Sequence, residues 1–140
     1  MDFPVKSLGV VGGGVVGSAV ARTYAEFAEV RVWDTDPRRR TVNDPVRALD
    51  CDLVFVCLPT PAGPDGRLDV SALDGFFGGL RRESYSGVDF VLRSTVPVGY
   101  TRGAAERFGL TNLVHSPEFL TARCAGVDSA FPAANLVGCT

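Results

Sequence analysis

The sequence has almost no lysine and almost no histidine. Lys6 and His115 are the only residues of these two types in a chain of 140 residues that has 14 Lys and Arg residues in total. The 16 acidic residues outnumber the lysines and arginines, and the formal net charge is −2. Binding to a nucleic-acid backbone requires a basic surface, so we expect no nucleic-acid partner. A mechanism that needs a catalytic lysine would have to use Lys6 or a residue outside this chain.

The sequence also lacks the signatures of several other protein classes. No apolar run approaches the roughly 18 residues that cross a membrane, and the first residues, MDFPVK, do not form a signal peptide. No pair of cysteines has the C-x-x-C spacing of a zinc site. We therefore expect no metal, no membrane association, a cytoplasmic location and four reduced cysteines, which are Cys51, Cys57, Cys124 and Cys139.

Short apolar runs alternate with segments of helical length. Strands are expected at residues 7–12, 29–33, 52–58, 88–93, 112–115 and 134–138. Helices are expected at residues 15–27, 70–82 and 99–108, with a helical turn at 119–124. Pro37 and Pro45 lie between the second and third strands, so any helix there must be short. The alternation predicts an α/β fold, a doubly wound six-stranded parallel sheet of Rossmann type, in a single domain over residues 1–140.

A glycine-rich loop lies between the first expected strand and the first expected helix. Gly12, Gly14 and Gly17 form the pattern G-x-G-x-x-G. The first glycine allows a tight turn, the second lets a pyrophosphate approach the backbone, and the third lets the helix pack closely on the sheet. The helix would then present free N–H groups to the phosphates. The loop therefore predicts a dinucleotide site, for which a glycine-rich structural turn is the alternative.

An acidic residue follows at the spacing that this motif requires. Asp34 ends the second expected strand, 22 residues after Gly12. A carboxylate at this position accepts hydrogen bonds from the ribose hydroxyls and repels a 2′-phosphate, which favours NAD over NADP. Arg38, Arg39 and Arg40 follow closely. They could bind a 2′-phosphate or simply form a solvated basic turn, and the position of Asp34 favours NAD.

Three further motifs follow the third, fourth and fifth expected strands. They are CLPTP at residues 57–61, STVPVG at 94–99 and SPEFL at 116–120. Ligands of open α/β sheets bind over the carboxyl ends of the strands, so these motifs should meet beside the glycine loop. Taken with the glycine loop, with Asp34 and with NLVG at 135–138, they resemble the N-terminal NAD-binding domain of the UDP-glucose/GDP-mannose dehydrogenase family.

The resemblance implies NAD as cofactor and the oxidation of a nucleotide-sugar alcohol to a uronic acid. By matched position, the cofactor-binding residues would be Gly12, Gly14, Val15, Val16, Gly17, Asp34, Arg39, Leu58, Pro59, Thr60, Ser94 and Thr95. Glu118 and Thr95 would take part in catalysis, with Glu118 handling a proton through water. A first-turn helix residue is the structural alternative for Glu118. A structural role is expected for Cys124, Cys139 and His115.

The chain also departs from the family pattern. Ser116 replaces an asparagine, Ala122 replaces a second acid, and the connection before the third strand is shorter than in the family. The family's nucleophilic cysteine, catalytic lysine and substrate-binding asparagine have no counterpart in this chain. The resemblance therefore implies a cofactor domain, inactive alone, whose substrate-binding domain is absent from the chain. The alternatives are a non-catalytic NAD(H)-binding or interaction module, for which a homodimer is an option, and a fragment of another β-hydroxyacid-type dehydrogenase.

Overall fold

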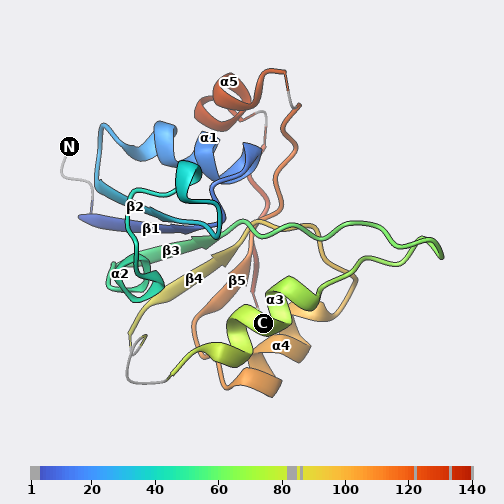
Figure 1. Cartoon of the computed structure of the whole chain (residues 1–140). Coiled ribbons are helices and arrows are strands. Elements are labelled where there is room, and N and C mark those ends of the chain that lie inside the picture. The colour runs from blue at the N-terminus through green and yellow to red at the C-terminus, as the bar shows by residue number, and fades with distance from the viewer. Residues whose placement is uncertain (1–3, 82–84, 86, 122, 133, 140) are drawn as a thin grey trace.

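The computed structural model describes residues 4–81, 85, 87–121, 123–132 and 134–139. Its six-stranded sheet has the order β2-β1-β3-β4-β5-β6 (Figure 1). The strands are β1 (Ser7–Val11), β2 (Glu29–Trp33), β3 (Leu53–Val56), β4 (Asp89–Leu92), β5 (Leu113–His115) and β6 (Gly138–Cys139). The helices are α1 (Val15–Tyr24), α2 (Pro45–Leu49), α3 (Ser71–Gly79), α4 (Tyr100–Phe108) and α5 (Ala125–Ala130), with a 3-10 helix η1 (Pro37–Arg39). The predicted doubly wound α/β class is confirmed.

The prediction of an entirely parallel sheet is wrong at the last strand. Strands β1 to β5 are parallel, whereas β6 runs antiparallel to β5, with Gly138 opposite His115. A parallel β6 would require the chain to return to the amino edge of the sheet after β5. Helix α5 is only six residues long, which gives it a length of about 9 Å. The chain re-enters the sheet at its carboxyl edge, beside His115, and therefore runs antiparallel.

Two further boundaries differ from expectation. The turn expected at residues 119–124 is not helical where it is described, and α5 begins after it, with Cys124 as its N-cap residue. The cause is visible in Thr121, whose backbone N–H and hydroxyl both donate to the Asp128 carboxylate at 2.8 Å and so hold the chain outside the helix. The helix expected to reach residue 27 ends at Tyr24.

The connection between β2 and β3 is short, as its two prolines predict. It contains η1 and the five-residue α2, and each begins at a proline. The side chains of Asp36 and Asp44 cap the two elements by accepting hydrogen bonds from Arg38 N–H and Val46 N–H. Proline at the first helical position costs no hydrogen bond, because the N–H groups there have no partner within the helix.

Helices cover both faces of the sheet (Figure 1). Helices α1 and α5 lie on one face, over a cluster that includes Leu8, Val10 and Val20. Helices α3 and α4 cover the other face, where Phe77 packs edge-on against Phe90 at a centroid distance of 6.2 Å. These side chains are at most 2% exposed. Burial on both faces explains why the strands read as continuous apolar runs.

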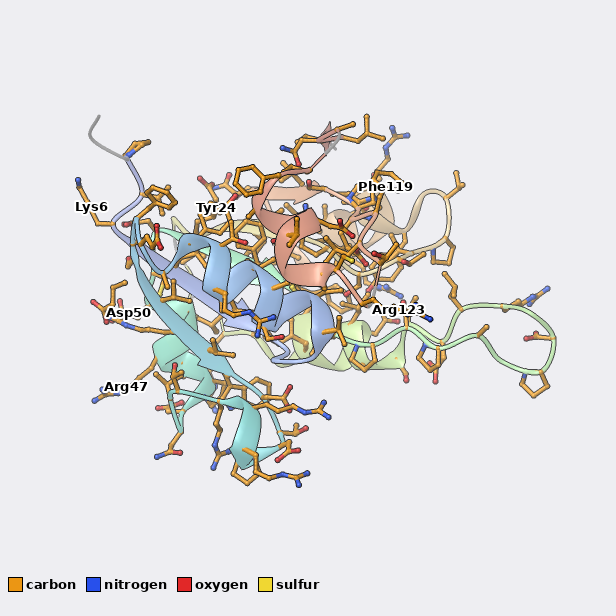
Figure 2. The ribbon with its side chains drawn as sticks, turned by 90° about the horizontal axis from the view of Figure 1, so that it is seen from above. Lys6, Tyr24, Arg47, Asp50, Phe119 and Arg123 are labelled. Carbon is orange, nitrogen blue, oxygen red and sulfur yellow. The ribbon has the colours of Figure 1, made fainter. Side chains whose placement is uncertain are left out.

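The two edges of the sheet carry different side chains (Figure 2). Lys6 and Asp50 lie at the amino edge, whereas Phe119 lies at the carboxyl edge. A two-stranded arm between β3 and α3 projects away from the body and is closed by a bridge between Ala62 and Leu68 (Figure 1). The position of Lys6 places it at the opposite edge from the glycine loop. None of the described helices has the length and apolar character needed to cross a membrane.

Candidate dinucleotide-binding site

The glycine loop lies at the point where the sheet order reverses. The chain leaves β1 for β2 on one side and later returns to β3 on the other side. Ligands of open α/β sheets bind in the crevice at this point, outside the carboxyl ends of the strands. The loop after β1 and the loop after β3 form the two walls of the crevice. Cys57 N–H donates to Val11 O at 2.8 Å and joins the two walls.

Each glycine of the motif has a distinct environment. Gly12 has φ +97°, and a Cβ atom there would lie 2.5 Å from the carbonyl oxygen of Cys57. A Cβ atom at Gly17 would lie 1.8 Å from the carbonyl oxygen of Gly12, so this glycine brings α1 against the loop. At Gly14 no heavy atom lies within 4 Å of such a Cβ atom. Gly12 and Gly17 therefore shape the loop, and Gly14 leaves open space beside it.

The amino end of α1 faces the same space. Gly14 is the N-cap residue, with no side-chain hydrogen bond to the helix, and Val15 and Val16 line the cleft. The first N–H groups of a helix have no partner within the helix and carry partial positive charge. An open glycine in front of these groups fits a pyrophosphate.

Asp34 lies across from the glycine loop at the end of β2. One of its carboxylate oxygens accepts a hydrogen bond from Gly13 N–H, and the other accepts from Asp36 N–H, both at 2.7 Å. These bonds fix the carboxylate at the rim of the cleft. Each carboxylate oxygen can accept more than one hydrogen bond, so the geometry leaves capacity for ribose hydroxyl groups.

A cleft of about 410 Å³ joins these elements. Its lining includes ten of the twelve predicted cofactor-binding residues: Gly12, Gly14, Val15, Val16, Asp34, Arg39, Leu58, Pro59, Ser94 and Thr95. Glu118 lies in the same cleft. Gly17 and Thr60 do not line it. Gly17 instead packs beneath the loop, and Thr60 supports a neighbouring loop from outside the cleft.

Two hydroxyl groups tie together the loops that follow β3 and β4. The Thr60 hydroxyl donates to the carbonyl oxygen of Thr95, and the Ser94 hydroxyl donates to that of Leu58, both at 2.7 Å. Ser94 is 8% exposed, whereas Thr95 is exposed at the cleft. Thr60 and Ser94 therefore position the backbone around Thr95, whose own side chain is accessible.

Glu118 and Arg93 lie at the end of the cleft formed by β4 and β5. Glu118 accepts a hydrogen bond from Leu120 N–H at 2.6 Å, and Arg93 donates to the Ser116 hydroxyl at 3.0 Å. The Nε atom of Arg93 is buried and has no partner among the described residues. Both side chains also line a larger groove between α1 and the chain around α5. Glu118 thus reaches the cleft from a loop rather than from a helix.

Four residues of the cleft are absent from the predicted site residues, although Cys57 belongs to the CLPTP motif expected there. They are Trp33, Thr35, Cys57 and Arg93, and each adjoins a residue that was singled out. The rule that ligands lie over strand ends points to all four, because each lies at the carboxyl end of β2, β3 or β4. Burial raises the pKa of Cys57 to about 12, outweighing the positive charge of Arg93. The thiol is therefore neutral and lines the cleft as an apolar group.

The other cysteines and His115 lie apart from this chemistry. Cys51 is buried, and Cys51, Cys57 and Cys124 are free thiols, while the side chain of Cys139 lies outside the described residues. Cys124 is exposed and is the N-cap residue of α5. His115 lies with its Nε2 atom 3.2 Å from the carbonyl oxygen of Ser94. Within the described ranges, no three His, Cys, Asp or Glu side chains form a metal-binding group.

The sheet order, the glycine loop and the strand-end cleft define a Rossmann-like fold, and comparison with solved structures agrees. The chain superposes with TM-score 0.77 on a UDP-glucose dehydrogenase from Pyrobaculum islandicum, at 23% identity, covering 95% of this chain and 40% of that one. The TM-score is 0.74 for a ternary complex of GDP-mannose dehydrogenase from Pseudomonas aeruginosa, at 22% identity over 94% of this chain and 40% of the other.

Sequence comparison points to one group of enzymes. The chain is 31% identical over 87 residues to UDP-glucose 6-dehydrogenase of Campylobacter jejuni, covering 60% of this chain and 22% of the relative. It is 25% identical to UDP-glucose 6-dehydrogenase of Streptococcus pneumoniae, covering 94% of this chain and 40% of the relative. No protein-family model matches. The resemblance to nucleotide-sugar dehydrogenases is confirmed, and the chain spans 22% to 40% of the length of these two relatives.

Proposed function

We propose that this chain is the NAD-binding part of a nucleotide-sugar 6-dehydrogenase of the UDP-glucose type. The observation that carries the proposal is the cleft itself, where the glycine loop, Asp34 and the motifs after β4 and β5 line one space. The similarity to UDP-glucose 6-dehydrogenases supports the same assignment. A structural glycine turn would not require an acidic residue and three further strand-end motifs around the same opening.

The residues divide by their position in the cleft. The open space at Gly14 and the amino end of α1 would hold the pyrophosphate, Asp34 would hold the adenosine ribose, and Arg39 would lie near that end of the cofactor. Leu58, Pro59 and Ser94 would shape the wall toward the nicotinamide. NAD, when bound, accepts a hydride from the carbon atom that is oxidised.

Thr95 and Glu118 are the catalytic candidates at the other end of the cleft. Thr95 presents an exposed side chain on a backbone that Thr60 holds by a 2.7 Å hydrogen bond. Glu118 offers a carboxylate that could transfer a proton to or from water beside the reacting carbon. The nucleotide sugar itself would need further residues, which a second domain or chain would supply. The chain alone would therefore bind NAD without oxidising UDP-glucose.

Trp33 provides a direct binding assay. It is the single tryptophan of the chain, and it lines the cleft. Titration with NADH should quench its emission and produce energy transfer to the reduced nicotinamide, and calorimetry should give a dissociation constant for NAD. A side chain at Gly14 would fill the open space in front of α1. We expect Gly14→Val to weaken NAD binding by about tenfold or more, equivalent to at least ~1.4 kcal/mol.

A matched variant separates the loss of the site from a general effect of valine. Gly103 in α4 also has no atom within 4 Å of an added Cβ, and it lies outside the cleft. Gly103→Val should leave the dissociation constant for NAD within about twofold of the original. Absence of binding of NAD, NADH and NADPH to the unmodified chain would reject the proposed function.

A non-catalytic NAD(H)-binding or interaction module remains the second candidate. The observation that favours it is the short segment between β2 and β3, which contains only η1 and the five-residue α2. The proposed function and the NAD(H)-binding version of this module both predict NAD binding. Adding UDP-glucose, together with a chain that contains a substrate-binding domain of such a dehydrogenase, distinguishes them, because only a dehydrogenase part would then support NADH formation. Steady NADH formation by this chain alone would contradict both.

A further inference from the structure

Three consecutive arginines follow the ribose end of the cleft, and Arg39 among them lines it. Arg38 and Arg39 are in η1, and Arg40 follows it. This turn lies directly against the glycine loop, since a Cβ atom at Gly13 would be 2.3 Å from the carbonyl oxygen of Arg39. Guanidinium groups in this position could bind the 2′-phosphate of NADP, because they bind phosphate in a bidentate manner. Something else must determine whether they do so.

Asp36 contacts two of these guanidinium groups. Its carboxylate accepts hydrogen bonds from Arg38 Nε at 3.0 Å and from Arg38 Nη2 at 2.8 Å, a bidentate pair. The Nε atom of Arg39 lies 3.7 Å from the same carboxylate. Hydrogen bonding to Arg38 lowers the pKa of Asp36, so the carboxylate is ionised at neutral pH. Asp36 itself is not part of the cleft lining, whereas Arg39 is.

Asp36 is also joined to the carboxylate that faces the cleft. Its backbone N–H donates to Asp34 at 2.7 Å, so the two acids are linked through one turn of the chain. Its side chain accepts from Arg38 N–H at 3.0 Å and thereby caps η1. One residue thus fixes the direction of Asp34, the start of η1 and the position of the Arg38 guanidinium group.

We propose that Asp36 is a specificity-determining residue that favours NAD by holding Arg38, and by attracting Arg39, away from the 2′ position of the adenosine ribose. This inference rests on the proposed function, because it requires a dinucleotide in the cleft. Asp34 repels a 2′-phosphate directly, whereas Asp36 removes the cations that would otherwise attract it. The two acids therefore act on the same choice by different routes, and their effects are separable by mutation.

The decisive variant is Asp36→Asn. Asparagine keeps an oxygen that can accept from Arg38 N–H, so the cap of η1 is retained, but it loses the charge that holds the guanidinium groups. We expect NADP binding to become tighter by about twofold to fivefold, within the range of a single exposed ion pair, while NAD binding changes by less than about twofold. Calorimetric titration of both dinucleotides at low ionic strength measures the two constants.

Asp44→Asn is the matched control. Asp44 caps α2 by accepting from Val46 N–H, as Asp36 caps η1, and it lies on the same connection but outside the cleft lining. The variant changes the net charge equally, so its ratio of NADP to NAD affinity should stay at the value of the unmodified chain. If the ratio of NADP to NAD affinity rose equally in both variants, the change in net charge alone would explain the rise, and the inference would be overturned.

The double variant Asp36→Asn/Arg38→Gln identifies the released group. If Arg38 is the main cation that Asp36 restrains, the gain in NADP affinity should largely disappear in the double variant. Asp36→Ser, which also retains a capping oxygen, replaces Asp36→Asn if the latter fails to show the circular dichroism of the folded chain.

The remaining outcomes are distinguishable. A chain that binds NAD, with an affinity ratio that does not change in Asp36→Asn or Asp36→Ser, overturns the inference and leaves the proposed function intact. An unmodified chain that prefers NADP also overturns it, since the arginines would then already be available. A chain that binds neither dinucleotide rejects the proposed function and this inference with it.

Discussion

Two regions of the molecule bury their apolar side chains to different degrees. In the region from β1 to β5, residues 7–115, Leu8, Val10 and Leu73 are 0% exposed. In the region that follows, residues 116–139, Phe131 is 82% exposed and Val137 is 61% exposed. The second region is attached through the contact of α5 with α1, through the hydrogen bonds of Ser116 with Leu92 and Arg93, and through the two residue pairs of β6 with β5. Global stability therefore resides in the first region, whereas the second can open locally.

The largest expected difference concerns two phenylalanines. Phe77 in α3 is 2% exposed and contacts Phe90 and Phe108, while Phe131 follows α5 and is exposed. Phe77→Ala should lower the free energy of unfolding by about 3–5 kcal/mol, because it removes buried area and leaves a cavity. Phe131→Ala should change it by no more than about 0.5 kcal/mol. Urea denaturation of both variants measures the difference, and similar losses would contradict the division into two regions.

A smaller effect is expected within the glycine loop. Gly17→Ala should lower the free energy of unfolding by about 1–3 kcal/mol, since the new Cβ would lie 1.8 Å from the carbonyl oxygen of Gly12 and the helix must move. Gly14→Ala has open space at the same loop, so its thermal midpoint should stay close to that of the unmodified chain. Melting curves without ligand compare the two variants. An equal fall of the thermal midpoint in Gly14→Ala would contradict the open space at Gly14.

The sequence and the structure agree where local patterns determine local geometry. The glycine loop, Asp34 and the five parallel strands follow from apolar runs, turn residues and spacing, and all of them concern neighbours along the chain. The direction of β6 could not be predicted in this way, because it depends on where the chain emerges from α5 once that helix has packed on α1. Patterns within residues 134–138 carry no information about that path.

The candidate site shows the same limit. Ligands of open α/β sheets bind over the carboxyl ends of the strands, and this rule alone predicts that the residues after β3, β4 and β5 meet. Leu58, Ser94 and Glu118 do line one cleft. The position of Thr60 outside the cleft depends on its hydrogen bond to Thr95, a contact over 35 residues. Arg93 was missed because the preceding apolar run makes it appear as the end of a strand rather than as part of a site.

Two serines provide a third test of the comparison. Ser94, in the first region, is buried and donates to the carbonyl oxygen of Leu58, whereas the hydroxyl oxygen of Ser129 in α5 lies 3.0 Å from that of Thr23. Ser94→Ala should lower the free energy of unfolding by about 1–3 kcal/mol, because the Leu58 carbonyl loses its hydroxyl partner. Ser129→Ala should cost less than about 1 kcal/mol, since its partner Thr23 also bonds to the carbonyl oxygen of Ala19. Denaturant titration of the pair gives both values, and a larger loss at Ser129 would show that α5 belongs to the cooperative core.

The smallest expected effect is in the acid dependence of unfolding. Asp52 joins the start of β3 to the N–H groups of Lys6 and Ser7, and Asp128 accepts from Thr121 in the second region. These hydrogen bonds lower the pKa of both carboxylates below their ordinary values. A carboxylate with a lowered pKa in the folded chain stabilises it above the unfolded-state pKa of about 3.9, and this contribution is lost as the pH falls through the folded-state pKa.

Of these two carboxylates, only Asp52 should contribute this dependence to global unfolding. Asp52→Asn should lower the thermal midpoint at pH 7 and flatten its decline below about pH 4, because one carboxylate that binds a proton on unfolding has been removed. Asp128→Asn should leave the midpoint curve nearly unchanged, since the second region opens before the core unfolds. Midpoints measured from pH 2 to pH 7 for both variants make the comparison. An equal flattening in Asp128→Asn would mean that residues 116–139 unfold together with the sheet, and that their exposed side chains do not mark a separate region.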